Sequence, residues 1–209
     1  SLEDTYKEYA GDGAIRYLGR CKDIEVQPGW ERIVVKWTNS VDPLVEQVKV
    51  RWSYNDVADS VLLSAGTTEY SINQLAGQQL GDKNIEVTLC TVGKDGSRSL
   101  TNTVYGRAYS YAHEDVECFN RIVSTVYRVK SRVALTFLAW QDGIKEARLQ
   151  YTKADGTPAE LELTKAVMNQ KFLLLDDEVD ITKPIVVQRT AQLSGCLDEI
   201  VFQPMELDN

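Results

Sequence analysis

This sequence of 209 residues has no run of about 18 apolar residues, the length that a membrane-spanning helix requires. The missing run excludes such a helix, because the longest apolar pieces are only as long as strands. His113 is the only histidine, and no Gly-x-Ser-x-Gly motif accompanies it, so a Ser/His/Asp or Cys/His nucleophilic site has little support. We interpret His113 as a solvent-exposed residue of an interdomain junction.

The chain also lacks a P-loop, a dinucleotide-binding fingerprint and any run of Lys and Arg. Asp and Glu number 31 against 23 Lys and Arg, which gives a formal net charge of −8. Nucleic acid and anionic membrane surfaces are therefore poor partners, because both need positive charge to neutralise phosphates. We expect no cofactor and no nucleic-acid partner.

Acidic residues are plentiful, but their pattern does not indicate catalysis. The densest cluster, at residues 176–180, lacks the spacing and the glycine of an EF-hand loop, so we interpret it as a plain acidic loop and expect no metal site. Other acids fall mostly in turns or at outward positions of strands. We expect a protein that is not an enzyme; a glycosidase would need two facing carboxylates in a cleft.

The pattern that is present is alternation. Ile33, Val35 and Trp37 alternate with polar neighbours, which is typical of a strand with one buried face. Val133, Leu135 and Phe137 repeat this pattern at an offset of 100 residues, obtained by subtracting the residue numbers. Third and sixth strands repeat as well, at offsets of 99 and 100. A duplicated domain is the simplest explanation.

The spacing of strands and turns predicts an all-β chain with two tandem seven-strand antiparallel β-sandwiches. We place a leader at 1–20 that packs on the first domain, a first sandwich at 21–108 and a second at 109–209. Strands of the first are expected at 24–26, 31–38, 48–54, 60–63, 70–72 and 85–89, with a seventh that ends near Gly106. Strands of the second are expected at 122–129, 133–139, 147–151, 161–163, 172–174, 185–187 and 200–202.

The four cysteines permit three pairings. Cys21 and Cys118 lie near the first strand of each repeat, and Cys90 and Cys196 lie near the end of the sixth strand or just after it. If disulfides form, Cys21–Cys90 and Cys118–Cys196 are the expected pairs. Four free thiols, some of them buried as small apolar groups, are the alternative.

Several motifs of the first domain together resemble the fibronectin type III domain: Trp37, Val48-Lys49-Val50-Arg51-Trp52, Ile85-Glu86-Val87-Thr88-Leu89 and Gly93-Lys94-Asp95-Gly96-Ser97. This resemblance implies an immunoglobulin-like sandwich with sheets of three and four strands. The tyrosine that this family usually carries at the start of the sixth strand is replaced by Ile85, and by Ile185 in the second copy.

A narrower set of residues is similar to an uncharacterised family of secreted Gram-negative surface lipoproteins: Tyr17-Leu18-Gly19-Arg20, Pro28-Gly29, Trp37, and Asp42-Pro43 before Val50-Arg51-Trp52. Those proteins carry tandem sandwiches behind a lipidated cysteine and often accompany polysaccharide capture. The resemblance implies an extracellular, cell-surface location, as an outer membrane lipoprotein whose lipid anchor lies upstream of this chain. It supplies no catalytic residue.

Exposed aromatic side chains are the best candidates for ligand binding, because sugar rings stack their C–H faces on them. Trp37 and Trp52 are in phase with core positions and are expected to be buried. Trp30 follows a Pro-Gly turn, Trp140 is out of phase with its strand, and Tyr54 ends the third strand, so these three are the predicted ligand-binding residues. The alternative for each is packing against the leader or the other domain.

The sequence thus predicts a non-catalytic binding or adhesion module on a cell surface, with polysaccharide capture as the leading function and a glycan or a surface protein as partner. The alternative is a structural spacer or protein-interaction scaffold that holds a partner away from the membrane.

Overall fold

The computed structural model describes residues 17–208. The chain divides into two compact units, Ser1–Tyr109 (unit 1) and Ser110–Asn209 (unit 2). Most of the predicted leader lies outside the described residues. Its last part, from Tyr17 onward, lies on unit 1: Leu18 is buried and its backbone N–H donates a hydrogen bond to the Arg98 carbonyl. No helix among the described residues is long and apolar enough to cross a membrane.

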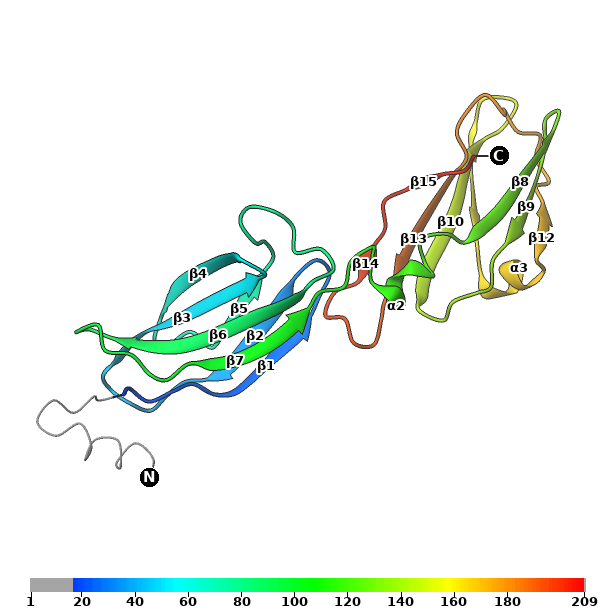
Figure 1. Ribbon diagram of the computed structural model, residues 1–209. Coiled ribbons are helices and arrows are strands. Elements are labelled where there is room, and N and C mark those ends of the chain that lie inside the picture. Colours follow the sequence, from blue (N-terminus) through cyan, green and yellow to red (C-terminus); the bar gives the residue numbers. More distant parts are fainter. Residues whose placement is uncertain (1–16, 209) are drawn as a thin grey trace, which may run out of the picture. The chain divides into compact units, whose positions relative to one another are not determined.

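Unit 1 is a β-sandwich of seven strands (Figure 1). One sheet has three strands in the order β1-β2-β5, and the other has four in the order β4-β3-β6-β7. All pairings between neighbouring strands are antiparallel. The strands are β1 (Lys22–Pro28), β2 (Ile33–Thr38), β3 (Val45–Tyr54), β4 (Val57–Ser64), β5 (Glu69–Ile72), β6 (Asn84–Gly93) and β7 (Asn102–Arg107).

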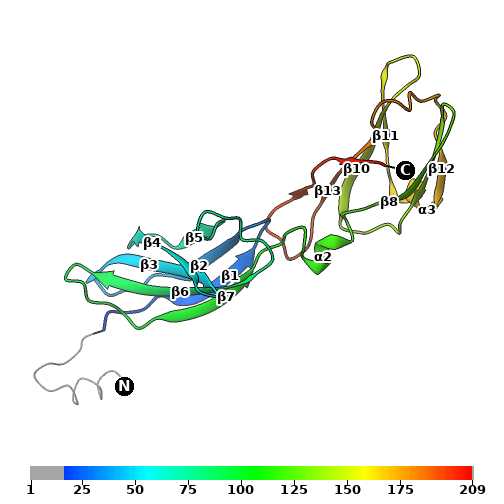
Figure 2. The same ribbon diagram turned by 45° about the horizontal axis from the view of Figure 1, so that its top comes forward.

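Unit 2 repeats this architecture. Its three-stranded sheet has the order β12-β9-β8, and its second sheet runs β11-β10-β13-β14, with β15 also paired to β13. Figure 1 shows β8, β9 and β12 on one side of this unit and β10 and β13 on the other, and Figure 2 shows β12 and α3 on the side away from β10 and β13. The elements are α2 (Glu114–Glu117), β8 (Val123–Val129), β9 (Arg132–Phe137), β10 (Ile144–Thr152), β11 (Pro158–Glu162), α3 (Lys165–Asn169), β12 (Phe172–Leu174), β13 (Val186–Ala191), β14 (Ile200–Val201) and β15 (Met205–Glu206).

The predicted fold class is confirmed, and the repeated register is also a repeated core. Ile33 and Val133 are both fully buried, and Trp37 and Phe137 are 5% and 9% exposed. The same agreement holds for the other pairs that the offsets of 99 and 100 relate, all of them buried: Val35 with Leu135, Val50 with Leu149, Trp52 with Tyr151, Ile85 with Ile185, and Val87 with Val187.

The two predicted core tryptophans are buried, and each finds an acceptor for its indole N–H. Trp37 donates to Oδ1 of Asn39 at 3.1 Å, and Trp52 donates to the carbonyl of Gln74 at 2.8 Å. A buried indole N–H without an acceptor would destabilise the fold, so these bonds allow both rings to fill the core. Trp37 is thus a core residue and not a ligand platform.

Some local predictions were wrong. The seventh strand of unit 2 is split into β14 and β15, and Pro204, which cannot donate to the ladder, lies between the two pieces. The strand predicted at 133–139 ends at Phe137, and both short helices of unit 2 were missed.

All four cysteines are free thiols, which is the alternative that the sequence left open beside the two pairs. Strand alternation separates the members of the first pair. Leu89 of β6 is buried in the core, so its neighbour Cys90 belongs to the outward set of that strand, whereas Cys21 lies in the core cluster. For the second pair, Cys118 is exposed after α2 and Cys196 is buried after β13. Burial raises the pKa of the Cys21 thiol.

Candidate ligand-binding groove of unit 2

Trp140 lies in the loop of residues 138–143 that joins β9 to β10. This loop begins where Leu138 donates its backbone N–H to the carbonyl of Ile122. Helix α3 lies next to this loop. It directly precedes β12, which pairs with β9, and the Phe137 N–H at the end of β9 donates a hydrogen bond to the carbonyl of Lys171 between α3 and β12. The sheet therefore holds the Trp140 loop and α3 beside each other, and Figure 1 shows α3 near the end of β9.

Helix α3 begins at an N-cap formed by Thr164. The Thr164 hydroxyl accepts a hydrogen bond from the N–H of Val167 at 3.2 Å, which satisfies a donor of the first turn. Met168 faces inward and is 2% exposed, whereas Lys165 and Asn169 are exposed. This short helix thus turns its polar side chains towards solvent while Met168 anchors it to the core.

Between the loop and α3 lies an open groove of about 600 Å³. Trp140 forms part of its wall and is partly exposed, and Asp142 and Lys165 approach each other across it, with Oδ1 and Nζ 3.8 Å apart. The full lining consists of Phe137, Leu138, Ala139, Trp140, Asp142, Lys165, Met168, Asn169 and Lys171. We call this pocket the Trp140 groove.

The Trp140 groove combines one aromatic surface with hydrogen-bonding groups of several kinds. The indole offers an apolar face to a flat ring, the Asp142 carboxylate accepts hydrogen bonds, Lys171 and Lys165 donate them, and the Asn169 amide does both. Such a mixture suits a ligand with apolar faces and many hydroxyl groups.

The other two predicted ligand residues belong to unit 1. Trp30 is partly exposed in the β1–β2 turn, where it forms an isolated parallel bridge with Tyr109. Tyr54 ends β3, is 37% exposed, and has the Lys83 ammonium 5.6 Å from its ring centre. Both lie at the same end of unit 1, but on different sheets. The three predicted residues therefore do not form one site within either unit, because Trp140 belongs to unit 2.

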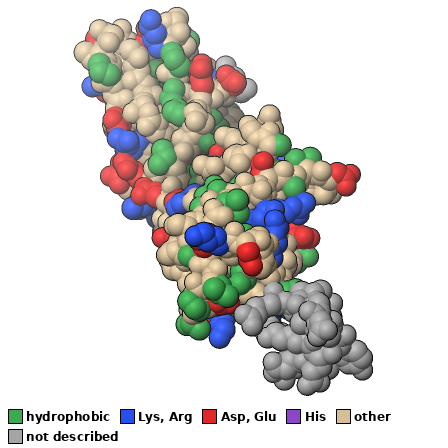
Figure 3. Space-filling model, turned by 90° about the vertical axis from the view of Figure 1, so that its left-hand side faces the viewer, with side chains coloured by type: hydrophobic (Ala, Val, Ile, Leu, Met, Phe, Trp, Pro, Cys, Tyr) green, Lys and Arg blue, Asp and Glu red, His purple; other side chains and the backbone are tan. Residues whose placement is uncertain are grey.

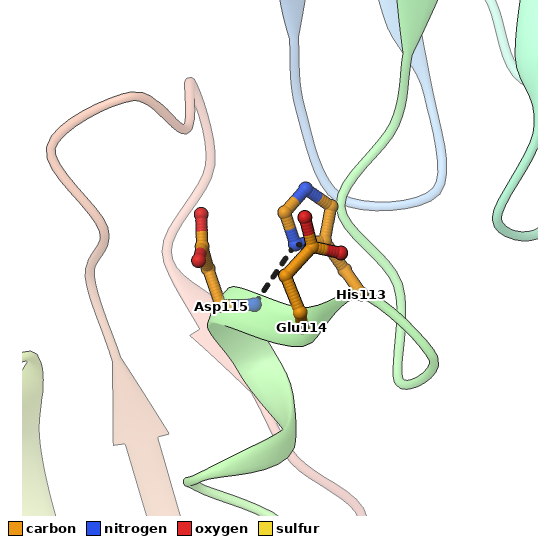
Figure 4. Close-up of side chains that lie close together, drawn as sticks. All are labelled: His113, Glu114 and Asp115. Atoms are coloured by element: carbon orange, nitrogen blue, oxygen red, sulfur yellow. Dashed lines mark hydrogen bonds and ion pairs between the residues drawn. The ribbon is translucent and has the colours of Figure 1, made fainter.

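The junction histidine is not the solvent-exposed residue that we expected. His113 is 7% exposed, and its Nδ1 accepts a hydrogen bond from the Asp115 N–H at 3.0 Å (Figure 4). Nδ1 lies 3.8 Å from Glu114 Oε2, so these three residues form a cluster of metal-ligand type. Because the Nδ1 lone pair already caps α2, we interpret His113 as a helix cap.

The acidic loop at residues 176–180 is held by protein partners. The Asp180 carboxylate accepts hydrogen bonds from the N–H and hydroxyl of Thr182, which lower its pKa. Asp177 accepts a hydrogen bond from the Tyr151 hydroxyl at 2.6 Å, and Lys153 lies 3.8 Å from it. These contacts engage the carboxylates of Asp177 and Asp180, two of the acidic side chains of the loop.

A second group of carboxylates lies on the outer face of the sheet that contains β10 and β11. Arg148 pairs with Glu146 and Glu160 at 2.9 Å each, and Lys145 pairs with Glu199 at 3.0 Å. Each of these side chains is 40% exposed or more. A glycosidase acid needs an apolar pocket that keeps its proton at neutral pH, and this solvated, ion-paired face does not provide one.

Sequence reasoning named Trp140 as a candidate but did not name its neighbours in the groove. Thr164 followed by Lys165, Ala166, Val167 and Met168 is a helix-start signal, but a helix of five residues is too short to show a periodic pattern. Asn169 and Lys165 could not be linked to Trp140 from sequence, because they are joined only by the pairing of β12 with β9.

The family model DUF4998, described as a domain of unknown function, matches residues 1–186, which include unit 1 and most of unit 2. The chain belongs to the DUF4998 family. None of the curated proteins compared with this DUF4998 chain matches it.

Two solved structures are similar to the chain in fold. A two-domain fibronectin type III segment from chicken tenascin is 11% identical, with 90% of this chain and 97% of that chain covered and a TM-score of 0.40. The FN1–FN3 domains of chicken CNTN1 are 10% identical, with 94% of this chain and 70% of that chain covered and a TM-score of 0.41.

Proposed function

We propose that this chain is a non-catalytic binding module that captures polysaccharide, and that sugar residues bind in the Trp140 groove. The observation that carries the proposal is the partly exposed indole of Trp140 in a groove with carboxylate, amide and ammonium groups around it. A pyranose ring presents an apolar face that stacks on an indole, while its hydroxyls pair with such polar groups.

The display of this module on a cell surface, as a lipoprotein anchored upstream of this chain, is part of the same proposal. Its support is the sequence resemblance carried by Tyr17-Leu18-Gly19-Arg20 and Asp42-Pro43. In the structure these segments are linked, because the Gly19 N–H donates to the Asp42 carboxylate at 3.0 Å. A capture module at that location would hold polysaccharide near the cell.

The experiment is a glycan array on the full chain and on Trp140→Ala. We expect binding to a subset of glycans that is lost in the variant, because removal of the indole removes the stacking surface. The matched controls are Trp30→Ala and Tyr54→Ala, which remove the other predicted ligand residues in unit 1. Unchanged thermal unfolding of each variant shows that the fold is intact.

The outcomes separate three possibilities. Loss of binding in Trp140→Ala alone supports the groove. Loss in Trp30→Ala or Tyr54→Ala, with Trp140→Ala unaffected, refutes the groove and moves the site to unit 1. No binding to any glycan refutes polysaccharide capture.

The second candidate is a structural spacer or protein-interaction scaffold. It is favoured by exposed apolar side chains on the four-stranded sheet of unit 1, where Leu62 of β4 is 53% exposed and Tyr105 of β7 is 58% exposed. Both lie on edge strands, which are common sites of strand and face contacts between proteins.

A further inference from the structure

The outer faces of the two three-stranded sheets differ in chemistry although their registers correspond. In unit 1, Glu69 of β5 lies opposite Lys36 of β2. In unit 2 the corresponding place on β12 is taken by Phe172, opposite Thr136 of β9. A pair of opposite charges in one copy is thus replaced by a phenyl ring and a threonine in the other.

The next row across the same sheets shows the same replacement. Val34 of unit 1 is flanked by Ser71 on β5 and Gln27 on β1. Its equivalent in unit 2, Ala134, is flanked by Leu174 on β12 and by a tyrosine, Tyr127, on β8. Since unit 1 folds with polar residues at these places, the fold itself does not require apolar ones.

Four exposed residues form a surface that we call the apolar face: Phe172, Leu174, Tyr127 and Val129. They are exposed by 54%, 49%, 51% and 68% of their surface, and Ala134, which is buried at 8% exposed, lies between Leu174 and Tyr127. Contiguous apolar surfaces of this kind are unusual on soluble proteins and mark interaction sites. By contrast, ion pairs of Arg148 with Glu146 and Glu160 lie on the outer face of the other sheet of unit 2.

The rim of the apolar face is mostly basic. Residues 118–141 and 163–175, which supply β8, β9, α3 and β12, contain six of the 23 Lys and Arg of the chain and none of its 31 Asp and Glu. One acid, Asp142, follows directly and lies 3.8 Å from Lys165 in the groove. Lys130, Lys165 and Lys171 of these segments are exposed. These segments are thus positively charged, although the chain as a whole has a net charge of −8. On the face of the molecule that Figure 3 shows, acidic and basic side chains are interspersed.

The apolar face is continuous with the Trp140 groove. Thr136 faces outward on β9, and Leu138, two residues later, points to the same side. Leu138 is 42% exposed and lines the groove. Lys171 also lines the groove and directly precedes Phe172. A chain-like ligand seated at Trp140 can therefore continue over Phe172 towards Tyr127.

We propose that the ligand of this site is an anionic polysaccharide, whose sugar rings stack on Trp140, Phe172 and Tyr127 and whose carboxylate or sulfate groups pair with the lysines of the rim. This inference rests on the proposed function and adds the class of glycan and the direction in which it extends. Charge complementarity selects the anionic class, because a neutral glycan would gain no charge pairing from these lysines.

Two other occupants fit the observations less well. A second copy of the chain would bring the same lysines against each other, which is unfavourable. An anionic bilayer binds apolar side chains that penetrate it. The residues of the apolar face lie on flat strands, and the hydroxyls of Ser124 and Thr136, 2.8 Å apart, lie beside them and would have to enter the bilayer too. Flat aromatic surface with hydroxyl groups suits a sugar chain.

The test measures binding of the full chain to polygalacturonate, dextran sulfate and neutral dextran by calorimetry, at low and at high salt. We expect binding to one or both anionic polymers, weakened by salt, and weaker or no binding to dextran; the two anionic polymers distinguish carboxylate from sulfate. The double variant Lys165→Gln, Lys171→Gln should lower the affinity by about tenfold and flatten the salt dependence, because two exposed ion pairs are lost.

Phe172→Ser and Tyr127→Ser should each weaken binding without changing its salt dependence. The matched controls lie on the outer side of the other sheet of unit 2. Lys145→Gln removes a lysine whose side chain is 59% exposed, close to the 63% of Lys165, and Val201→Ser changes an apolar residue that is 68% exposed, as Val129 is. Both controls should leave binding unchanged.

The failures are distinguishable. Equal binding of dextran and the anionic polymers, lost in Trp140→Ala, would overturn the anionic class and leave polysaccharide capture intact. No polysaccharide binding at all would overturn both proposals. Binding to phosphatidylglycerol vesicles in its place would assign the face to a membrane, and a dimer that Phe172→Ser dissociates would assign it to a second copy.

Discussion

Phe172 of unit 2 takes the place that Glu69 has in unit 1, each on the edge strand of a three-stranded sheet and each opposite the same position of the central strand. The duplicated fold therefore offers its own control for the role of this residue. A position that accepts a carboxylate in one copy is not required to be apolar for stability in the other.

We predict that Phe172→Glu changes the free energy of unfolding by less than about 1 kcal/mol, because Phe172 is 54% exposed and only its strand propensity is affected. Chemical denaturation measures this. The comparison variant is Leu135→Ala, a fully buried residue of the neighbouring strand, which should cost about 2–5 kcal/mol. Similar losses for both variants would contradict the view that the apolar face is functional and not structural.

Tyr151 and Asp177 predict a loss of stability at high pH. Burial, together with the hydrogen bond to Asp177, raises the pKa of Tyr151 to about 12 from the ordinary value of 10.0. The folded state thus holds this proton more tightly than the unfolded state. Its contribution to stability is complete below pH 10.0 and disappears as the pH rises through about 12.

The measurement is urea unfolding across this pH range, with ultraviolet spectroscopy of phenolate formation. Tyr151→Phe should remove this part of the pH dependence. A variant with the same alkaline loss as the parent would show that other tyrosines cause it.

We expect substitution of Arg189 to lower the free energy of unfolding strongly. Arg189 is 6% exposed, and its guanidinium donates hydrogen bonds to three backbone carbonyls. It donates to the carbonyls of Phe119 at 2.6 Å, Asn120 at 2.9 Å and Gln203 at 3.3 Å, and it lies 4.7 Å from the centre of the Phe202 ring. Burial lowers the pKa of its guanidinium.

Arg189→Ala should destabilise the chain by about 1–3 kcal/mol for each carbonyl left without a donor, with incomplete additivity. Arg189→Lys should restore only part of this, because an ammonium cannot reproduce the planar fork. Denaturant midpoints test both. Full rescue by lysine would mean that charge alone matters at this position.

A side chain larger than glycine should not fit at position 106, on the edge strand β7 of unit 1. A Cβ at this position of β7 would collide with side-chain atoms of Val26 and Ile33 in the facing sheet. Gly106→Val should therefore cost about 1–3 kcal/mol through overpacking. Gly66→Ala is the matched control, because a Cβ added at Gly66 would have no atom within 4 Å, and it should be neutral or slightly stabilising. Equal thermal shifts for both would refute the packing argument.

The cysteines predict a graded reaction with a thiol reagent. Cys118 is exposed and should react first in the native protein, whereas Cys21 and Cys196 are buried and should react only when the fold opens. Mass spectrometry without a reducing agent should find four free thiols. A disulfide between any two of them would contradict the structure.

The sequence by itself determined the fold class and the core. Alternation in segments such as Ile33, Val35 and Trp37 decides locally which side chains face inward, and the offset of 100 residues carries this decision to the second copy. The same alternation places Cys90 in the outward set of β6. The pairing with Cys21 was based on the position of Cys90 near the end of the strand and did not use this alternation. Trp140 was proposed as a ligand-binding residue because it breaks the alternation.

Only the tertiary structure decided what surrounds Trp140. Lys165 and Asn169 come from another segment, and they reach the groove because β12 pairs with β9. The apolar face has the same origin, since no single strand of it is unusual and its character appears when three strands lie side by side. Local pattern fixes the inward side of a strand, but the neighbours of its outward side depend on pairing between distant segments, which the sequence pattern does not encode.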